Sequence, residues 1–464
     1  MDSSNDLILA SKSCRRHSRG FAWLGLPLIR PKDELTPISS LPTEVITIIF
    51  SFLCLPATSL LGEKPNHHLV WQPVAHVCHQ WREIAINQPL LWSHIDFNKL
   101  TLAGVIEILT RAKEVPLHLI ARFTGYNDYR FHSFKNVLQL RVSHICHLTI
   151  CTEASYSRSI LEELASPAPN LEYLSLSYLE TGHGIRVPDT LFDRTTPRLS
   201  CLELHNFDVS WRSPLLKGLR YLKIHSPSNF ARPSLADWLD TLEQLPQLEG
   251  LVLHSASPIA PPHPFDVGCI ATLPFLTHLD ISASAGDCAF ALAHLALPVI
   301  TCLCVAAWPE NRLAVDAQIL LPYVARHAYG PQDTQPLQSV LIRGPWSSTK
   351  IIAWPEPDIV VEPDDTATWR AATLTARVAL SVSKGSYIIL HSFIVDAIAA
   401  LPLHSLATLT SDYCAPLAEQ FWLRHAPRWP CSNMCVSRPV QRVDSARCCC
   451  CRTTTGASAH CSHR

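Results

Sequence analysis

The sequence has little glycine and no excess of charge of either sign. None of its 15 glycines forms a GxGxxG or GxxxxGK[ST] motif, so the common glycine-rich phosphate-binding loops are excluded. HExxH and GxSxG are also missing, which argues against the metalloprotease and α/β-hydrolase active sites. Lys plus Arg total 38 and Asp plus Glu total 39, giving a net charge of −1. That balance does not favour binding to nucleic acid or to an anionic membrane.

Apolar residues, proline and cysteine are plentiful in the 464 residues. Hydrophobic residues make up 47% and charged ones 17%, so a large core is possible and general disorder is not expected. Seven of the 18 cysteines crowd into residues 431–464, and most of the others sit inside apolar segments, as small buried thiols do. No Asn-x-Ser/Thr site occurs, and these features favour a reducing compartment, cytoplasmic or nuclear.

The first ordered segment is predicted to begin at Leu41-Pro42-Thr43-Glu44. Proline in the first turn of a helix sacrifices no hydrogen bond, and Glu44 suits the positive N-terminal end. The residues that follow carry two apolar stripes on different sides, which is too apolar for a surface helix of a small domain. One stripe therefore lies in a larger core or is covered by a partner chain. The stripes are Val45, Ile48, Ile49 and Phe52, and Ile46, Phe50 and Leu53.

A second helix is predicted over residues 74–85, after a loop at 55–72. Apolar residues at 74, 77, 78, 81, 84 and 85 follow helical spacing. Pro89 disfavours a helical residue before it, so the helix should end near Asn87. Residues 90–97, including Trp92, are expected to form an extended anchor.

Together these segments resemble an F-box over residues 38–97, with an extra loop between the two halves. The resemblance is carried by Leu41-Pro42-x-Glu44-Val45, Ile49-Phe50-Ser51-Phe52-Leu53, Val77-Cys78-x-x-Trp81-Arg82-x-Ile84-Ala85 and Pro89-Leu90-Leu91-Trp92. It implies a helical module that binds the Skp-type adaptor of a Skp–cullin–F-box ubiquitin ligase, with a cullin as scaffold. The alternative is an internal helical hairpin without a partner. The residues that the resemblance assigns to the adaptor surface and its support are Leu41, Pro42, Glu44, Val45, Ile49, Phe50, Val77, Cys78, Trp81 and Trp92.

From residue 145 the pattern apolar-x-x-apolar-x-apolar recurs. It begins at residues 145, 171, 199, 219, 248, 276, 300 and 337, with a mean step of about 27 residues. Helix-like segments that end at proline lie between the hits. The pattern resembles irregular leucine-rich repeats and predicts an α+β or α/β solenoid, a curved array over residues 145–425 after a connector at 98–144. Residues 387–390 and 403–406 are expected to extend its strands.

Alternate residues of the predicted strands should point to the concave face of this array, where a protein substrate would bind. Three consecutive units place histidine at their seventh position, within a mixed polar and aromatic strip suited to protein recognition. A solvated face without a ligand is the alternative. A metal ion held by the three histidines is disfavoured, because no cysteine or carboxylate completes a compact set. The candidate substrate-binding residues are Tyr173, His205, Tyr221, His225, His254 and Arg343.

The two ends of the chain are predicted to be unstructured, a flexible leader at residues 1–37 and a Cys-rich tail at 426–464. The four adjacent cysteines at 448–451 cannot all face one tetrahedral ion, so no metal site is expected there. The 21 uncharged residues from Cys288 to Trp308 are long enough to cross a bilayer. The repeat instead explains this stretch as helix, turn and strand, with a break at Pro298.

The sequence therefore predicts a substrate-recognition subunit and not an enzyme. No nucleophile, base and acid can be assembled from the spacing of the residues, so catalysis would belong to partner chains. No cofactor, metal, nucleic acid or membrane is expected, and the substrate is an unknown protein. Two alternatives stay open, namely a binding scaffold outside ubiquitination and a membrane-anchored repeat protein.

Overall fold

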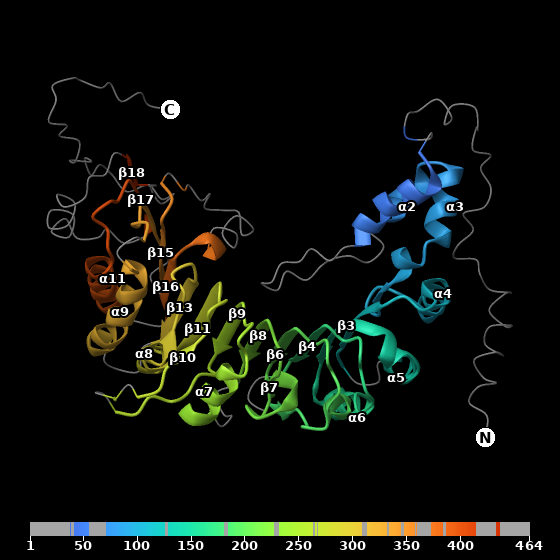
Figure 1. Ribbon diagram of the computed structural model, residues 1–464, viewed down its shortest axis with the longest axis horizontal. Helices are drawn as coiled ribbons and strands as arrows, with labels where there is room; N and C mark the ends of the chain where they lie inside the picture. The colour runs from blue at the N-terminus through green and yellow to red at the C-terminus, as the bar shows by residue number, and fades with distance from the viewer. Residues whose placement is uncertain are drawn as a thin grey trace.

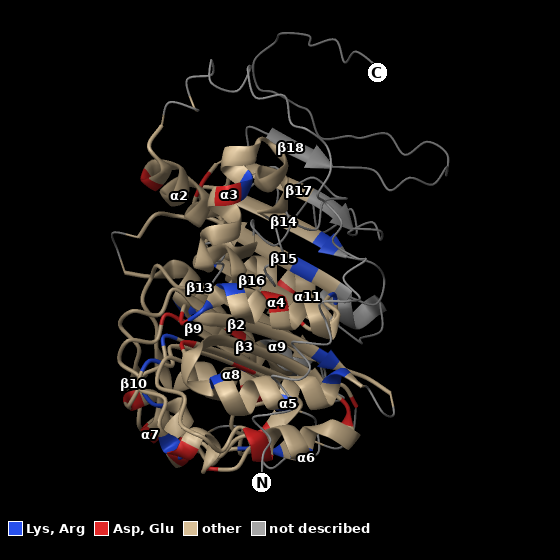
Figure 2. Ribbon diagram, turned by 90° about the vertical axis from the view of Figure 1, so that its right-hand side faces the viewer, with Lys and Arg blue, Asp and Glu red and all other residues tan. Residues whose placement is uncertain are grey.

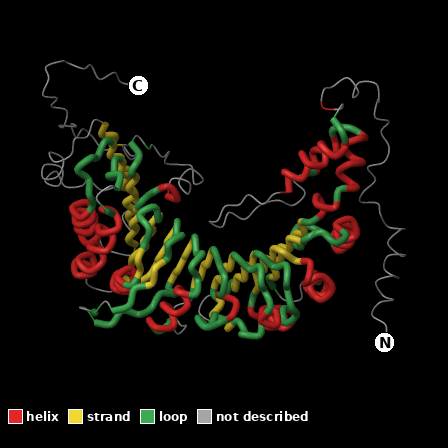
Figure 3. Tube along the Cα trace, viewed as in Figure 1, coloured by secondary structure: helices red, strands yellow, loops and turns green. Residues whose placement is uncertain are grey.

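A computed structural model shows a helical N-terminal region that leads into one large sheet. It describes residues 38, 41–54, 71–125, 129–180, 184–226, 232–262, 265–266, 268–308, 313–331, 334–344, 348–357, 359, 373–383, 387–413 and 433–436. The strands follow an arc with the N-terminal helices at one end (Figure 1). The helices of the sheet lie on the outer, convex side of the arc (Figure 3). Lys and Arg are interspersed with Asp and Glu along the chain (Figure 2). The predicted leader at 1–37 lies outside the described residues.

The N-terminal region is built from two helices of nine residues each, α2 (Thr43–Ser51) and α3 (His79–Asn87). Short 3₁₀ turns at Phe52–Cys54, Gln72–His76 and Pro89–Trp92 connect them and lead to the first strand. The prediction of one unbroken helix over 74–85 is wrong, because the backbone of Cys78 is extended and its Sγ accepts the backbone N–H of Trp81 at 3.5 Å. Cys78 therefore caps α3 at its N-terminus, where backbone N–H groups lack partners within the helix.

The large sheet has 14 strands, of which β15 alone among the described strands runs antiparallel to both of its neighbours. Two short two-stranded sheets lie beside it, β5 (Ile185–Arg186) with β7 (Phe207–Asp208) and β10 (Ala271–Thr272) with β12 (Leu295–Ala296). In spatial order the strands of the large sheet are β1 (His94–Asp96), β2 (Leu117–Phe123), β3 (Ile145–Thr152), β4 (Tyr173–Tyr178), β6 (Cys201–His205), β8 (Tyr221–His225), β9 (Gly250–His254), β11 (His278–Ser284), β13 (Cys302–Trp308), β16 (Val378–Ser383), β15 (Ser348–Trp354), β14 (Ser339–Gly344), β17 (Thr408–Tyr413) and β18 (Asn433–Val436).

The helices that connect the strands cover one face of this sheet. Short 3₁₀ turns at Val142–His144, Leu191–Arg194 and Pro214–Leu216 take part in the connections. The helices are α4 (Leu102–Ala112), α5 (Arg130–Arg141), α6 (Ala154–Glu163), α7 (Leu235–Glu243), α8 (Ala285–Ala293), α9 (Leu313–Tyr329) and α11 (Tyr387–Ala400).

Leucines at equivalent positions of successive strands form the core between the sheet and the helices. The central residues of the repeated pattern pair across the sheet in register, from Leu174 through Leu202, Leu222 and Leu251 to Leu279, and all are fully buried. Burial of each such side chain contributes about 1.5–3 kcal/mol. The structure thus places the first seven predicted segments on consecutive parallel strands. In the seventh segment the first residue of the pattern is not buried. Ile300 is exposed there, and the adjacent Thr301 is buried instead.

The eighth segment of the pattern lies in a strand, β14, but β13, the strand expected beside it, is not its neighbour. The structure separates β14 from β13 by β16 and β15. Only residues 345–347 connect β14 to β15, and so short a link forces the two strands into an antiparallel hairpin. The spacing of apolar residues therefore located the strand without revealing that a later segment, β16, inserts beside β13.

Two other segments differ from the expectation. Residues 387–390 begin helix α11 and are not a strand, because the apolar run continues at helical spacing to the buried Phe393, Ile394 and Ala397. Within the tail predicted to be unstructured, residues 433–436 form β18 and pair with β17, since the edge of the sheet offers free backbone groups. The rest of 414–464 lies outside the described residues.

The uncharged stretch from Cys288 to Trp308 contains most of α8, then β12 and β13, and so forms the predicted helix, turn and strand. Among the described residues, no helix has the length and apolar character needed to span a bilayer.

Gly250 accommodates a large side chain from the neighbouring strand. A Cβ at this position would clash with the ring of Tyr221. We expect Gly250→Ala to lower the free energy of unfolding by about 1–3 kcal/mol, as overpacking does. The effect should largely disappear when Tyr221→Ala is also present. Urea unfolding checks both variants, and Gly268→Ala is the control because nothing lies within 4 Å of its added Cβ. Equal losses for Gly250→Ala with and without Tyr221 would contradict this packing.

Candidate functional site

Helix α2 buries only one of its two apolar stripes within its own chain. Ile46 and Phe50 are each 1% exposed, and the ring of Phe50 meets that of Trp81 edge-on at 5.2 Å. This stripe packs with α3 and the turn before β1 into a small core separate from that of the sheet. The core of this module consists of Ile46, Phe50, Trp71, Ile84, Ala85 and Leu91.

The other stripe of α2 remains exposed. Ile48 is 57% and Phe52 is 64% exposed, and Val77, which precedes α3, is 55% exposed. The helix carries no basic residue and one acidic residue, Glu44 in its first turn, and Figure 2 shows it almost free of charge. A grouped set of large apolar side chains with so little charge is typical of a surface that another protein covers. We call this set the apolar face, and it consists of Val45, Ile48, Ile49 and Phe52.

The residues assigned to the adaptor by resemblance fall into two groups. Pro42, Glu44, Val45, Ile49 and Val77 are exposed, and Leu41 is half-buried. Phe50 and Cys78 are buried, and Trp81 and Trp92 are half-buried against the module's core. Phe50 therefore supports α2 from within and does not lie on the apolar face. Ile48 and Phe52 were left out of the assigned set, although the stripe at positions 45, 48, 49 and 52 was the signal that could have found them.

Trp92 connects this module to the sheet. Its Nε1 donates to the backbone carbonyl of Ala85 at 3.1 Å, and its ring contacts that of Trp71 at 4.7 Å. On its other side the guanidinium of Arg111 in α4 lies 4.5 Å from the Trp92 ring, a cation–π distance. The chain then enters β1, which pairs with β2. The apolar face is therefore held on a module that is anchored to the first strands of the sheet.

The face of the sheet opposite the helices carries the second set of candidate residues. His205, His225 and His254 pair in register on β6, β8 and β9, as the repeat predicted. Successive rings meet edge-on at 5.7 and 5.5 Å. His254 Nε2 lies 3.4 Å from a carboxylate oxygen of Asp280 on β11. Burial, together with the nearby His254 and Lys223, lowers the pKa of His225, so this ring is neutral at neutral pH.

The other predicted strip residues are less accessible or lie elsewhere. Tyr221 is buried, because its ring covers the position where Gly250 has no side chain, and so offers little surface to a substrate. Tyr173 is half-buried, and burial beside Glu203 raises the pKa of its hydroxyl. Arg343 is half-buried on β14, where it pairs with Lys350 of β15 and not with the strand of the preceding repeat.

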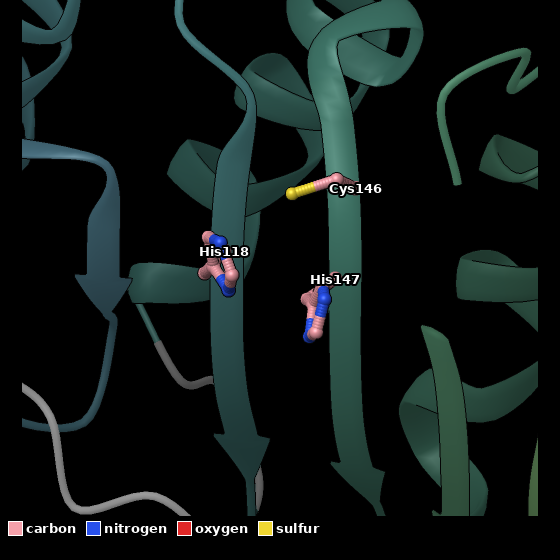
Figure 4. Close-up of side chains that lie close together, drawn as sticks. All are labelled: His118, Cys146 and His147. Atoms are coloured by element: carbon pink, nitrogen blue, oxygen red, sulfur yellow. The ribbon is translucent and has the colours of Figure 1, made fainter. Parts of the chain in front are cut away.

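A column of aromatic rings continues this face towards the N-terminal module. His94 stacks on His118 at 4.2 Å, His118 meets His147 at 4.3 Å, and His147 stacks on Tyr173 at 5.5 Å. Cys146 joins them through a register shift between β2 and β3, which inserts it as an extra residue. Figure 4 shows its sulfur between the two strands, on the side of His118 and His147.

Three potential metal ligands meet at this bulge. The ligand atoms of His118, Cys146 and His147 lie within 4.8 Å of one another. Burial, and next the charge of Glu172, raises the pKa of the Cys146 thiol to about 12, and its Sγ donates to the carbonyl of Leu117 at 3.4 Å. Burial also lowers the pKa of His147, so a neutral His147 ring lies beside a protonated thiol.

The sequence comparisons concern the N-terminal module. A family model described as F-box-like matches residues 38–98, which agrees with the resemblance over 38–97. The chain thus contains an F-box-like domain. F-box domains typically bind Skp-type adaptors, F-box proteins are generally adaptor subunits and not enzymes, and the domain suggests a role in a Skp–cullin–F-box ubiquitin ligase. No curated protein matches the chain.

His147 is expected to make the fold sensitive to acid. Burial lowers its pKa from 6.5 to about 4, so below pH 6.5 the unfolded chain takes up a proton that the folded chain does not. Stability should fall between pH 6.5 and 4, by up to about 3 kcal/mol from this group. We expect His147→Gln to reduce the shift of the urea midpoint between pH 7 and 4.5. The exposed His404→Gln is the control, and identical shifts in both variants would refute the assignment.

Proposed function

We propose that this protein is the substrate-recognition subunit of a Skp–cullin–F-box ubiquitin ligase. The observation that carries the proposal is the apolar face of α2 within a segment that matches an F-box-like model. Its large side chains stay in water although Ile46 and Phe50, on another side of the same helix, are buried. Covering these side chains with the apolar surface of a Skp-type adaptor would contribute binding energy without refolding of the module.

The adaptor surface is proposed to extend beyond α2. Val77 lies next to Cys78, whose side chain caps α3, so its exposed side chain is held at a defined place relative to that helix. Leu90, which is also exposed, lies in the turn that carries the buried Leu91. Pro42 and Glu44 occupy the start of α2. In this proposal Phe50, Cys78, Trp81 and Trp92 act indirectly, by fixing the two helices.

The sheet is proposed to be an irregular leucine-rich-repeat array over residues 145–425 that holds a protein substrate on its concave face. Recurring leucines in register, parallel strands and helices on the convex side all support this proposal. The concave face presents His205, His225 and His254 beside Lys223 and Asp280, a combination of rings and charges suited to polar contacts with a protein. Ubiquitin transfer would then be catalysed by partner chains recruited through the adaptor and a cullin, in the cytoplasm or the nucleus.

Adaptor binding should depend on the apolar face. We expect the double variant Ile48→Ser, Phe52→Ser to weaken binding of a purified Skp-type adaptor by at least tenfold, because both side chains would be desolvated in the complex. Since both are exposed in the isolated chain, the variant should keep the stability of the parent. The measurement is a titration by calorimetry with the full chain.

The control for this experiment is Leu140→Ser in α5, outside the module. Leu140 is an apolar side chain that is 64% exposed, as Phe52 is. The affinity of this variant for the adaptor should be unchanged. Unaltered binding by the double variant, or no binding by the parent chain, would leave the scaffold function as the better description.

Substrate binding should depend on the column that His205, His225 and His254 form on the concave face. We expect His205→Ala, His225→Ala to lose most of the proteins that the parent chain retains from proteasome-inhibited cells, while the adaptor is still recovered. The matched control is His132→Ala, His404→Ala, which changes two exposed histidines away from the column. Quantitative mass spectrometry compares the three chains. The same set of proteins retained by all three would argue against a substrate site at the column.

A further inference from the structure

A second group of three potential ligands lies further along the concave face, between β11 and β13. His278 pairs directly with Cys302 across the two parallel strands. Cys304 lies two residues after Cys302 and therefore points to the same face. One ligand atom from each of the three residues lies within 4.8 Å of the other two. Cys302 and Cys304 bring their sulfurs to 3.8 Å.

The three side chains are shielded from water. His278 and Cys304 are each 8% exposed, and Cys302 is 4% exposed. Cys302 and Cys304 belong to a small apolar cluster on this face together with Trp354 and Ala376. The segment before β16 closes over the site, because the backbone carbonyl of Thr373 accepts the thiol of Cys302 at 3.1 Å.

One polar atom in this enclosed group lacks a partner. Nδ1 of His278 is buried and has no hydrogen-bond partner in the structure. Leaving a buried polar atom unsatisfied costs about 1–3 kcal/mol, and native proteins have few such atoms. A metal ion bound to this nitrogen would accept its electron pair and remove this cost.

The two sulfurs of this site are placed so that one ion can bridge them. They lie 3.8 Å apart on one face, and Cys302 is the register partner of His278. A metal ion would displace the thiol protons, since metal binding releases protons from thiols.

We propose that His278, Cys302 and Cys304 bind a thiophilic divalent cation of the zinc type. Two thiolates and one imidazole are a ligand set that tetrahedral zinc prefers, with sulfur at about 2.3 Å and nitrogen at about 2.0–2.1 Å from the ion. The carboxylate of Asp280, the register partner of Cys304, lies 3.4 Å from His254 Nε2 and stays outside this ligand set. No metal was predicted from the sequence, and the spacing of His278, Cys302 and Cys304 along the chain follows no recognised ligand pattern.

The role of this site is structural. An ion would join β11 to β13 at the place where the consecutive parallel order of the sheet ends. Beyond β13 the hairpin of β14 and β15 continues the sheet. An ion that binds only the folded chain contributes folding energy directly. The proposal does not depend on adaptor or substrate binding.

The test uses the full chain with the seven cysteines of residues 431–464 changed to serine, so that they cannot bind metal. We expect this parent chain to retain one zinc ion, measured by elemental mass spectrometry. After replacement with cobalt(II), it should show a sulfur-to-cobalt charge-transfer band. Cys302→Ser, Cys304→Ser should lose both the ion and the band. Cys146→Ser, Cys151→Ser is the matched control, since it removes two buried thiols from β3 and should keep both signals.

His278→Gln provides a second variant that keeps both thiols. Loss of this ligand should weaken zinc binding by at least about tenfold to hundredfold, the loss that follows removal of a residue that only supports a ligand. The cobalt band should persist, but only at a higher metal concentration. Circular dichroism verifies the fold of each variant. The proposal fails if the parent chain binds no zinc and gives no cobalt band, a result that needs no variant to fold. It also fails if a folded Cys302→Ser, Cys304→Ser chain keeps the band.

Discussion

The register of the parallel strands is the constraint on which the rest of the structure depends. From β3 to β13 each strand aligns its central leucine or equivalent with that of the next, from Leu148 to Leu303. Because side chains alternate along a strand, this alignment sends one set of residues into the core and the other set to the concave face. A slip by one residue would exchange the two sets, so the leucines also determine which polar side chains become neighbours.

The same constraint explains why the concave face has both polar and buried parts. Side chains at one position form a column across the strands, and their neighbours determine whether that column is open or covered. His225 stays exposed among other histidines, whereas Tyr221, four residues earlier on the same face, is buried over Gly250. Near β13 the segment that precedes β16 covers the face, and Cys302 and Cys304 become buried there. The proposed metal site and the proposed substrate surface therefore belong to one face in two different environments.

The N-terminal domain follows a different principle, because it has too few residues to bury both stripes of α2. Its core uses Ile46 and Phe50, and the helix must leave Ile48 and Phe52 in water. Trp92 ties this small core to α4 and, through the chain that follows, to β1. A domain with an exposed apolar face on a firm support is suited to docking, and F-box domains typically bind Skp-type adaptors.

The amino-acid sequence by itself determined the local elements and much of their order. The two-sided helix, the F-box-like segment and seven consecutive strands were predictable, because they depend on apolar spacing within short segments. The column of His205, His225 and His254 followed from the same spacing. Other features required the tertiary structure, since they join residues distant in the chain. The insertion of β16 beside β13, the burial of Tyr221 over Gly250 and the meeting of His278 with Cys302 each depend on which strand lies next to which. Strand order is decided by the packing of the whole sheet and by the length of its connections, and no single segment contains that information.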